Sequence, residues 1–350
     1  MENKKFVLFS NCIPVKGHKR SIIYDLQRYK YDFIPNTLYF ILKKHNCKST
    51  IDEVKAIYNN EQDKIIDEYF KFLLQNEYLF FTYETQLFPK LNLDWDFPAQ
   101  ISNAIIDVAK DSKHNYQAIF NELNNLGCQA IEIRFYDKIS IKFLDSILTH
   151  TQQGRLRTIE LIIKYYDGLA ETHLKQLCKK NKRINSISIY DTYNTNETKY
   201  IEEEQCILNY TTEVISNNLH CGQINHQNFM VNTELFTESK NYNSCLNRKI
   251  SIDINGEIKN CPSMQKSYGN IKNTTLSKAL NKEGFKDVWN IKKDQIEICK
   301  DCEFRYMCTD CRVFIKDENN ILSKPAKCSY NPYTATWEDE NVTNNILYGK

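Results

Sequence analysis

Glycine is scarce in this sequence, with nine residues in 350. So few glycines leave little room for the glycine-rich loops that cradle the phosphates of a nucleotide, and ATP would therefore have to bind a partner. No uninterrupted apolar run approaches the length of a membrane-spanning helix, and the first twenty residues lack the apolar core of a secretory signal. We therefore expect a cytoplasmic protein with no membrane partner.

Net charge is also small, because 46 Lys and Arg residues stand against 44 Asp and Glu residues, a formal charge of +2. This balance gives no whole-protein attraction to nucleic acid, and we expect no nucleic-acid partner. The sequence has no convincing signature of Ser-His-Asp catalysis or of paired catalytic carboxylates, so no catalytic residue is assigned. Its composition, 41% hydrophobic and 26% charged, is that of a folded protein, and its length allows two or three domains.

Cysteine, in contrast, is abundant, with thirteen residues. In a reducing compartment, clustered thiols are better explained as metal ligands than as disulfides. Four of them follow the spacing C-x2-C-x5-C-x2-C, namely Cys299, Cys302, Cys308 and Cys311. A C-x2-C turn directs both thiolates toward one point, and two such turns can supply ligands for zinc or for cluster iron. This spacing predicts a metal site.

Three further cysteines extend the pattern. Cys245 and Cys261 flank an Asn-Gly turn at Gly256 with alternating apolar residues around it, which predicts a β-hairpin that brings Cys261 back toward Cys245. Cys328 is a seventh candidate ligand. Residues 240–328 hold 17 Lys and Arg against 11 Asp and Glu. These cations could offset the charge of thiolate ligands, or they could form a solvated basic face.

The first 90 residues combine β-like runs with helical patterns. The predicted strands are 6–10, 21–26, 29–34 and 78–83, and the predicted helices start near Pro35, at the capping-box sequence Thr50, Ile51, Asp52, Glu53, and around Ile65. This plan resembles the PqqD-like, winged-helix peptide-recognition domain. Such domains add an extended peptide to a sheet edge. The alternative is a small α+β domain that only packs on its neighbour.

The middle of the chain predicts an α/β architecture. Residues 91–125 read as a connection followed by a helix. Apolar runs at 130–136, 158–165 and 184–190 then alternate with helical patterns at 141–150 and 169–178. This order predicts right-handed βαβ crossovers and a parallel sheet. Three strands are too few to close an eight-stranded barrel, so we expect an open or partial (β/α) barrel.

The complete cysteine pattern from Cys245 to Cys328 resembles the SPASM domain. SPASM domains extend the carboxyl terminus of radical SAM enzymes that modify peptides and proteins, and they typically carry two [4Fe-4S] clusters. The resemblance implies one cluster on Cys299, Cys302, Cys308 and Cys328, and a second on Cys245, Cys261 and Cys311. The family usually places three residues between its last close pair, where this sequence has two before Cys311.

The second cluster is then one protein ligand short. Cys221, in LHCGQINH, is favoured over Cys206 as the additional ligand. Cys221 could instead be a buried free thiol, a common environment for cysteine. An open iron site is the third possibility.

The same resemblance also exposes an absence. Radical SAM enzymes carry a C-x3-C-x2-C motif after the first barrel strand, and no C-x3-C occurs here. Cys128 stands alone at the start of a strand and reads as a core residue. The chain as a whole resembles the peptide maturase of grasp-with-spasm systems. In this resemblance, residues 1–90 are a recognition domain, residues 91–235 a partial barrel and residues 236–350 a SPASM domain.

That resemblance implies partners and a process. The expected partners are a ribosomally made precursor peptide, bound through its leader, and an ATP-grasp ligase, with this protein acting in RiPP biosynthesis. Two other functions remain open at this point. One is an enzyme that uses an open iron site, and the other is a zinc-binding scaffold.

Overall fold

The computed structural model describes residues 3–338. The chain forms two compact units, each built from separate stretches of sequence. The first comprises Met1–Trp95, Gln223–Ser244 and Ile291–Lys350, and the second comprises Asp96–Gly222 and Cys245–Asn290. In the described part of the chain, no helix is long and apolar enough to cross a membrane.

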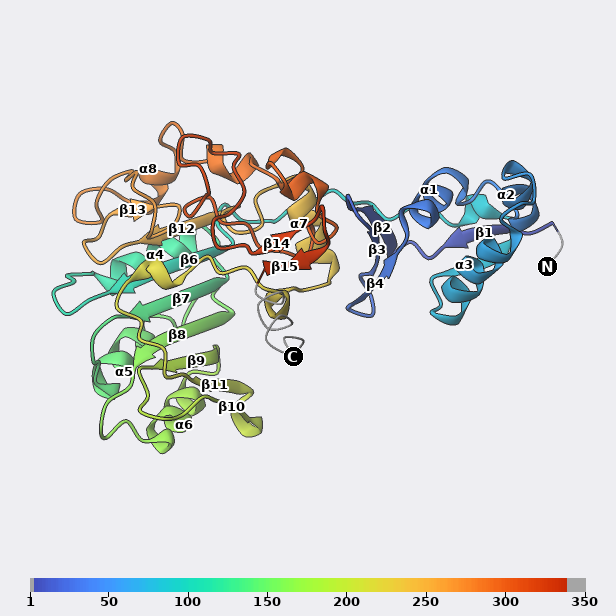
Figure 1. Cartoon of the computed structure of the whole chain (residues 1–350). Helices are drawn as coiled ribbons and strands as arrows, with labels where there is room; N and C mark the ends of the chain where they lie inside the picture. The colour runs from blue at the N-terminus through green and yellow to red at the C-terminus, as the bar shows by residue number, and fades with distance from the viewer. Residues whose placement is uncertain (1–2, 339–350) are drawn as a thin grey trace, which may run out of the picture. The chain divides into compact units, whose positions relative to one another are not determined.

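The amino-terminal part of the first unit combines two small antiparallel sheets with three helices (Figure 1). Strands β1 and β5 pair with each other, and the other three strands form a sheet in the order β2-β3-β4. The elements are β1 (Lys5–Leu8), β2 (Cys12–Lys16), β3 (Ser21–Asp25), β4 (Lys30–Ile34), α1 (Asn36–His45), α2 (Ile51–Ile57), α3 (Asp63–Gln75) and β5 (Leu79–Thr82), followed by a 3-10 turn η1 (Thr85–Leu87). The predicted helices and strands are confirmed, and β2 is an addition.

The capping box predicted at the start of α2 is also confirmed. The Thr50 hydroxyl accepts a hydrogen bond from the Glu53 N–H at 3.1 Å, and the Glu53 carboxylate accepts one from the Thr50 N–H at 2.8 Å. Behind the helices, Phe6 and Phe70 meet edge to face with ring centroids 4.8 Å apart. Both rings are almost fully buried, so the helices and β1 share one core.

The second unit contains an eight-stranded, mostly parallel sheet in the order β10-β11-β9-β8-β7-β6-β12-β13. Its strands are β6 (Asn103–Val108), β7 (Ala130–Phe135), β8 (Thr158–Lys164), β9 (Ile184–Tyr190), β10 (Glu197–Ile201), β11 (Cys206–Tyr210), β12 (Lys249–Ile252) and β13 (Ile258–Lys259). The six strands from β11 to β12 pair in parallel, and antiparallel β10 and β13 close the two ends. Figure 1 shows β7, β8, β9 and β11 side by side in this order.

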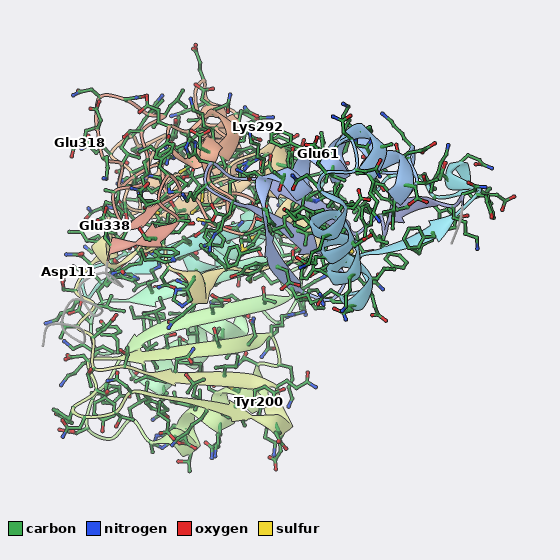
Figure 2. All side chains as sticks on the ribbon, turned by 45° about the vertical axis from the view of Figure 1, so that its right-hand side comes forward. Glu61, Asp111, Tyr200, Lys292, Glu318 and Glu338 are labelled. Carbon is green, nitrogen blue, oxygen red and sulfur yellow. The ribbon has the colours of Figure 1, made fainter. Side chains whose placement is uncertain are left out.

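Helices α4 (Tyr116–Asn125), α5 (Ile141–Thr149) and α6 (Glu171–Lys180) connect the strands. Alternate strand residues such as Ile131, Ile133 and Phe135 join the buried core with the apolar faces of these helices. Cys128 lies in the same core, as expected. At one end of the sheet, Tyr200 on β10 is 59% exposed (Figure 2).

The structure corrects the expectation for residues 91–125. They contain β6 in addition to the helix α4, and the sheet has more strands than the three predicted. Strand β12 pairs in parallel with β6, with Lys249 opposite Asn103. A partner 146 residues away leaves no signal in the local sequence.

The remaining elements are short, and all but the first of them follow β11. They are η2 (Glu202–Glu204), η3 (Asn218–His220), η4 (His226–Asn228), α7 (Thr233–Asn241), α8 (Leu276–Leu280), η5 (Asp287–Asn290), η6 (Lys293–Gln295), η7 (Cys299–Asp301), β14 (Tyr330–Asn331) and β15 (Thr336–Trp337). In the first unit, Tyr24 of β3 packs against Phe236 of α7 with centroids 5.1 Å apart, and Phe236 in turn contacts Tyr306 at 5.0 Å. The three-stranded sheet and the loop of residues 299–311, called the cysteine loop, therefore share a core.

Candidate metal centre

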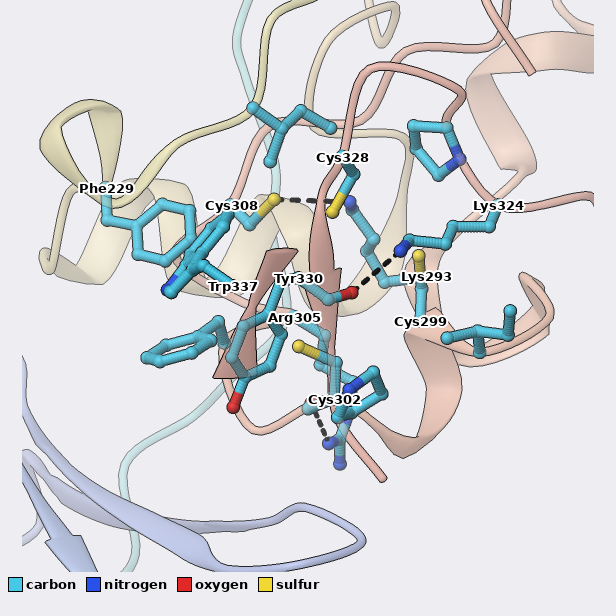
Figure 3. A pocket seen from close by; sticks show the side chains of 15 residues that line it. Phe229, Lys293, Cys299, Cys302, Arg305, Cys308, Lys324, Cys328, Tyr330 and Trp337 are labelled. Atoms are coloured by element: carbon cyan, nitrogen blue, oxygen red, sulfur yellow. Dashed lines mark hydrogen bonds between the residues drawn. The ribbon is translucent and has the colours of Figure 1, made fainter. Parts of the chain in front are cut away.

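Four predicted ligands, Cys299, Cys302, Cys308 and Cys328, line one cavity in the first unit. Figure 3 shows their sulfur atoms facing a common space. The other residues that line it are Ile224, Phe229, Lys293, Ile298, Phe304, Arg305, Lys324, Pro325, Tyr330, Pro332 and Trp337. Three of these are cationic and none is acidic. The cavity therefore combines thiols, positive charge and an apolar wall.

Local backbone geometry places the first two cysteines. Cys299 begins the turn η7, and the Cys302 N–H donates to the Cys299 carbonyl at 3.0 Å, so both side chains project from one tight turn. The preceding residue, Ile298, has φ 66°. A β-branched residue at positive φ is strained, and such strain persists where the surrounding structure enforces it, often at functional sites.

Cys328 comes from a distant segment. A parallel β-bridge joins it to Ile224, and the Ile224 N–H donates to the Lys327 carbonyl at 3.1 Å. Cys308 follows Met307, which is fully buried. Three separate stretches of the first unit thus contribute to the wall that carries the four thiols.

Burial dominates the electrostatics of three of these thiols. It raises the pKa of Cys308 to about 12, and it also raises the pKa of Cys299 and of Cys302. These three thiols therefore hold their protons at neutral pH, and a metal would bind by displacing those protons.

The spacing of these side chains bears on the kind of metal centre. Within residues 3–338, no three His, Cys, Asp or Glu side chains are arranged to share a single metal ion. In an iron–sulfur cluster the thiolates bind different irons, so their sulfurs need not converge on one point. Four cysteines around a cavity suit such a cluster.

A second group of cysteines lies in the second unit. The predicted Asn-Gly hairpin is confirmed: β12 and β13 pair antiparallel around Gly256, whose φ is +84°. The pKa of Cys261 is raised to about 12, chiefly by burial and further by the nearby thiols of Cys245 and Cys221. The hairpin and the segment before Gln223 thus bring Cys245 and Cys221 within electrostatic reach of Cys261.

Cys311 belongs to the first unit, where its sulfur accepts a hydrogen bond from the Phe314 N–H at 3.5 Å. It does not line the cavity of the other four cysteines. Its assignment as a ligand of the second cluster stays a prediction, as does that of Cys221.

Comparison with known proteins identifies the cysteine region. Residues 244–303 match the SPASM iron–sulfur cluster-binding domain. The SPASM match includes Cys245, Cys261, Cys299 and Cys302. The chain thus carries a SPASM region on a mostly parallel α/β framework.

Two solved structures have a loose overall likeness to the chain. They are Streptococcus suis SuiB bound to S-adenosylmethionine and SuiB bound to its precursor peptide SuiA, each 12% identical, covering 91% of this chain and 98% of theirs, with TM-scores of 0.32 and 0.30. No curated protein matches the chain significantly.

The sequence showed an excess of cations around the cysteines, but it did not show which of them lie beside a sulfur. Lys293 follows Lys292, a pair that reads as basic surface, yet Lys293 is only 2% exposed. Lys249 on β12 similarly donates to the Cys245 sulfur at 3.5 Å. Burial and proximity single out these residues, and neither is visible in the local spacing.

Proposed function

We propose that this protein is an iron–sulfur peptide maturation protein that acts with an ATP-grasp ligase on a ribosomally made precursor peptide. The observation that carries the proposal is the cavity lined by four cysteines and three cations, in a chain with a SPASM region. The proposed division of labour follows the sequence: residues 1–90 recognise the peptide, residues 91–235 form a reduced barrel, and residues 236–350 hold the clusters.

Cys299, Cys302, Cys308 and Cys328 would hold the first [4Fe-4S] cluster. When bound, such a cluster supplies a site that accepts and releases single electrons. The chain itself supplies the thiolates, the positive charge and an aromatic wall, in which Phe304 packs on Tyr330 at a centroid distance of 4.9 Å. This wall would limit the access of water, which tunes the potential of an enclosed metal centre.

The second [4Fe-4S] cluster would use Cys245 and Cys261, with Cys221 and Cys311 as the candidates that complete the set. Cys221 acts electrostatically on Cys261 within the second unit, which supports Cys221. Three thiolates from one unit also support a second candidate function, an enzyme with an open iron site. Product formed from the precursor peptide by this protein alone, and lost in Cys261→Ala, would establish that function. No product with any reductant would rule it out.

Peptide recognition is proposed for the sheet β2-β3-β4, whose outer strands are β2 and β4. Strand β2 contains Pro14, which has no N–H to donate to an added strand. This favours β4, where Phe33 is 43% exposed and could contact side chains of an added peptide.

Binding of a fluorescein-labelled precursor peptide, measured by fluorescence anisotropy, tests this assignment. Phe33→Asp should weaken binding at least tenfold, because it places a charge on the proposed contact. Ile57→Asp is the matched control, since Ile57 on α2 is 51% exposed and lies outside the sheet. Equal affinities of both variants and the wild type would place the peptide elsewhere.

Cluster content tests the function more directly. Anaerobically purified wild-type protein should contain iron and acid-labile sulfide, and Cys299→Ala should lose about half of both. Zinc in place of iron, with no sulfide, would instead favour the scaffold function.

A further inference from the structure

Each of the two cysteine groups has a lysine ammonium at the same distance from one sulfur. The Lys293 Nζ lies 3.5 Å from the Cys308 Sγ in the first unit. The Lys249 Nζ lies 3.5 Å from the Cys245 Sγ in the second. The lysines come from unrelated elements, η6 and β12, so the repeated contact does not follow from one local motif.

Lys293 is buried in a way that requires a negative partner. Its Nζ donates to the Thr309 carbonyl at 3.0 Å and lies 3.7 Å from the Asp310 carboxylate. That carboxylate is already bound by the Arg312 guanidinium at 2.7 Å and by the Asn243 amide at 2.6 Å. Two cations thus share one carboxylate in the interior. A buried charge is costly without compensation, so a positive charge remains for the cavity to balance.

The other cations around the cavity are engaged differently. Arg305 pairs with Asp294 at 3.0 Å, and the Lys324 Nζ donates to the Tyr330 carbonyl at 2.7 Å. Lys293 instead donates to a cysteine sulfur, as the dashed line in Figure 3 shows. The Lys293 ammonium therefore faces a candidate ligand sulfur inside the cavity.

Lys249 has comparable surroundings. Its Nζ donates to the Cys245 sulfur, and its strand β12 pairs with β13, which ends two residues before Cys261. The carboxylate of Glu132 forms an ion pair with Arg134. The Lys249 ammonium is therefore also placed beside a candidate ligand sulfur.

We propose that Lys293 and Lys249 are positioning residues that set the reduction potentials of two separate clusters, each by stabilising the reduced state of the cluster beside it. The proposal rests on the proposed function, because it requires the cysteines to hold clusters. One-electron reduction by dithionite adds one negative charge to a cluster and breaks no bond to the protein. A fixed cation hydrogen-bonded to a ligand sulfur favours that added charge and raises the potential.

The test is a potentiometric titration with dithionite, followed by electron paramagnetic resonance, on holoprotein of known iron and sulfide content. Lys293→Met should make one midpoint potential more negative, and Lys249→Met should do the same to the other. We expect at least a tenfold fall in the ratio of reduced to oxidised cluster at fixed potential, which equals about 59 mV for a one-electron couple. Lys293→Gln should shift the same midpoint as Lys293→Met, because it removes the charge and keeps a polar side chain.

The matched control is Lys300→Met. It removes the same charge one residue after Cys299, but Lys300 is exposed and its charge is screened by water. Unmoved midpoints in the Lys293 and Lys249 variants with full iron content would overturn this inference and leave the proposed function intact. Both lysines acting on the same midpoint would also overturn it. Wild-type protein without iron and sulfide would overturn the proposed function, and the inference with it.

Discussion

The contact between Arg20 and Glu303 joins the three-stranded sheet to the cysteine loop, and its removal should cost measurable stability. The Arg20 Nε donates to the Glu303 carboxylate at 2.8 Å, and the Glu303 side chain is fully buried while that of Arg20 is 33% exposed. Tyr330 donates to the same carboxylate oxygen at 2.5 Å. The Arg20 guanidinium also lies 3.5 Å from the centroid of the Phe33 ring. Arg20→Met would leave a buried carboxylate without its cation.

Breaking a buried ion pair costs about 3–5 kcal/mol, and the partial exposure of Arg20 puts the expected cost nearer 3 kcal/mol. The assay is urea denaturation followed by circular dichroism. Arg20→Met combined with Glu303→Gln should be more stable than Arg20→Met alone, because the double variant no longer buries an unpaired Glu303 carboxylate. Lys19→Met, an exposed neighbour in the same turn, should change stability by less than about 0.5 kcal/mol. The reasoning is wrong if Arg20→Met is no less stable than Lys19→Met.

Three further predictions concern stability elsewhere in the chain. Thr50→Ala should cost about 1 kcal/mol in urea denaturation, because it removes the side-chain oxygen that caps α2; an unchanged midpoint would contradict this. Phe70→Ala should cost about 3–5 kcal/mol, since it empties the space beside Phe6, whereas a loss below 1 kcal/mol would mean that the core collapses around it. Burial raises the pKa of Asp107 from 3.8 to about 6, so its carboxyl stays protonated in the folded state where the unfolded chain has released the proton. The stability that the protonated Asp107 carboxyl contributes is therefore lost as pH rises from about 4 to 6. Over this range the free energy of unfolding of Asp107→Asn should fall by roughly 3 kcal/mol less than that of the wild type. Identical pH profiles of the two proteins would refute the prediction.

Local patterns predicted much of the fold because they report local physics. The capping box at Thr50 and the turn at Gly256 each need only a few neighbouring residues, and both are confirmed. Strand β2 was missed because Pro14 interrupts its pattern, and an outer strand tolerates that interruption. Strand β6 was missed because the proline-marked segment 91–125 read as a connection.

The candidate site divides in the same way. Cysteine spacing is a local signal, and three of the four cysteines in the C-x2-C-x5-C-x2-C pattern, Cys299, Cys302 and Cys308, line one cavity. The place of the fourth cysteine of the cavity, Cys328, in this set was implied only by the SPASM resemblance. The role of Lys293 depends on burial and on a carboxylate already bound by Arg312, which are properties of the tertiary structure. The interaction of Cys221 with Cys261 likewise depends on two segments meeting in the second unit.

The central claim is that the cysteine region holds iron–sulfur clusters. Anaerobic purification followed by iron, acid-labile sulfide and zinc analysis, with absorption spectra before and after dithionite, tests it most directly. We predict about eight irons and eight sulfides per chain, with absorption that bleaches on reduction, as two [4Fe-4S] clusters require. Stoichiometric zinc without sulfide would contradict the claim and leave a zinc-binding scaffold in its place.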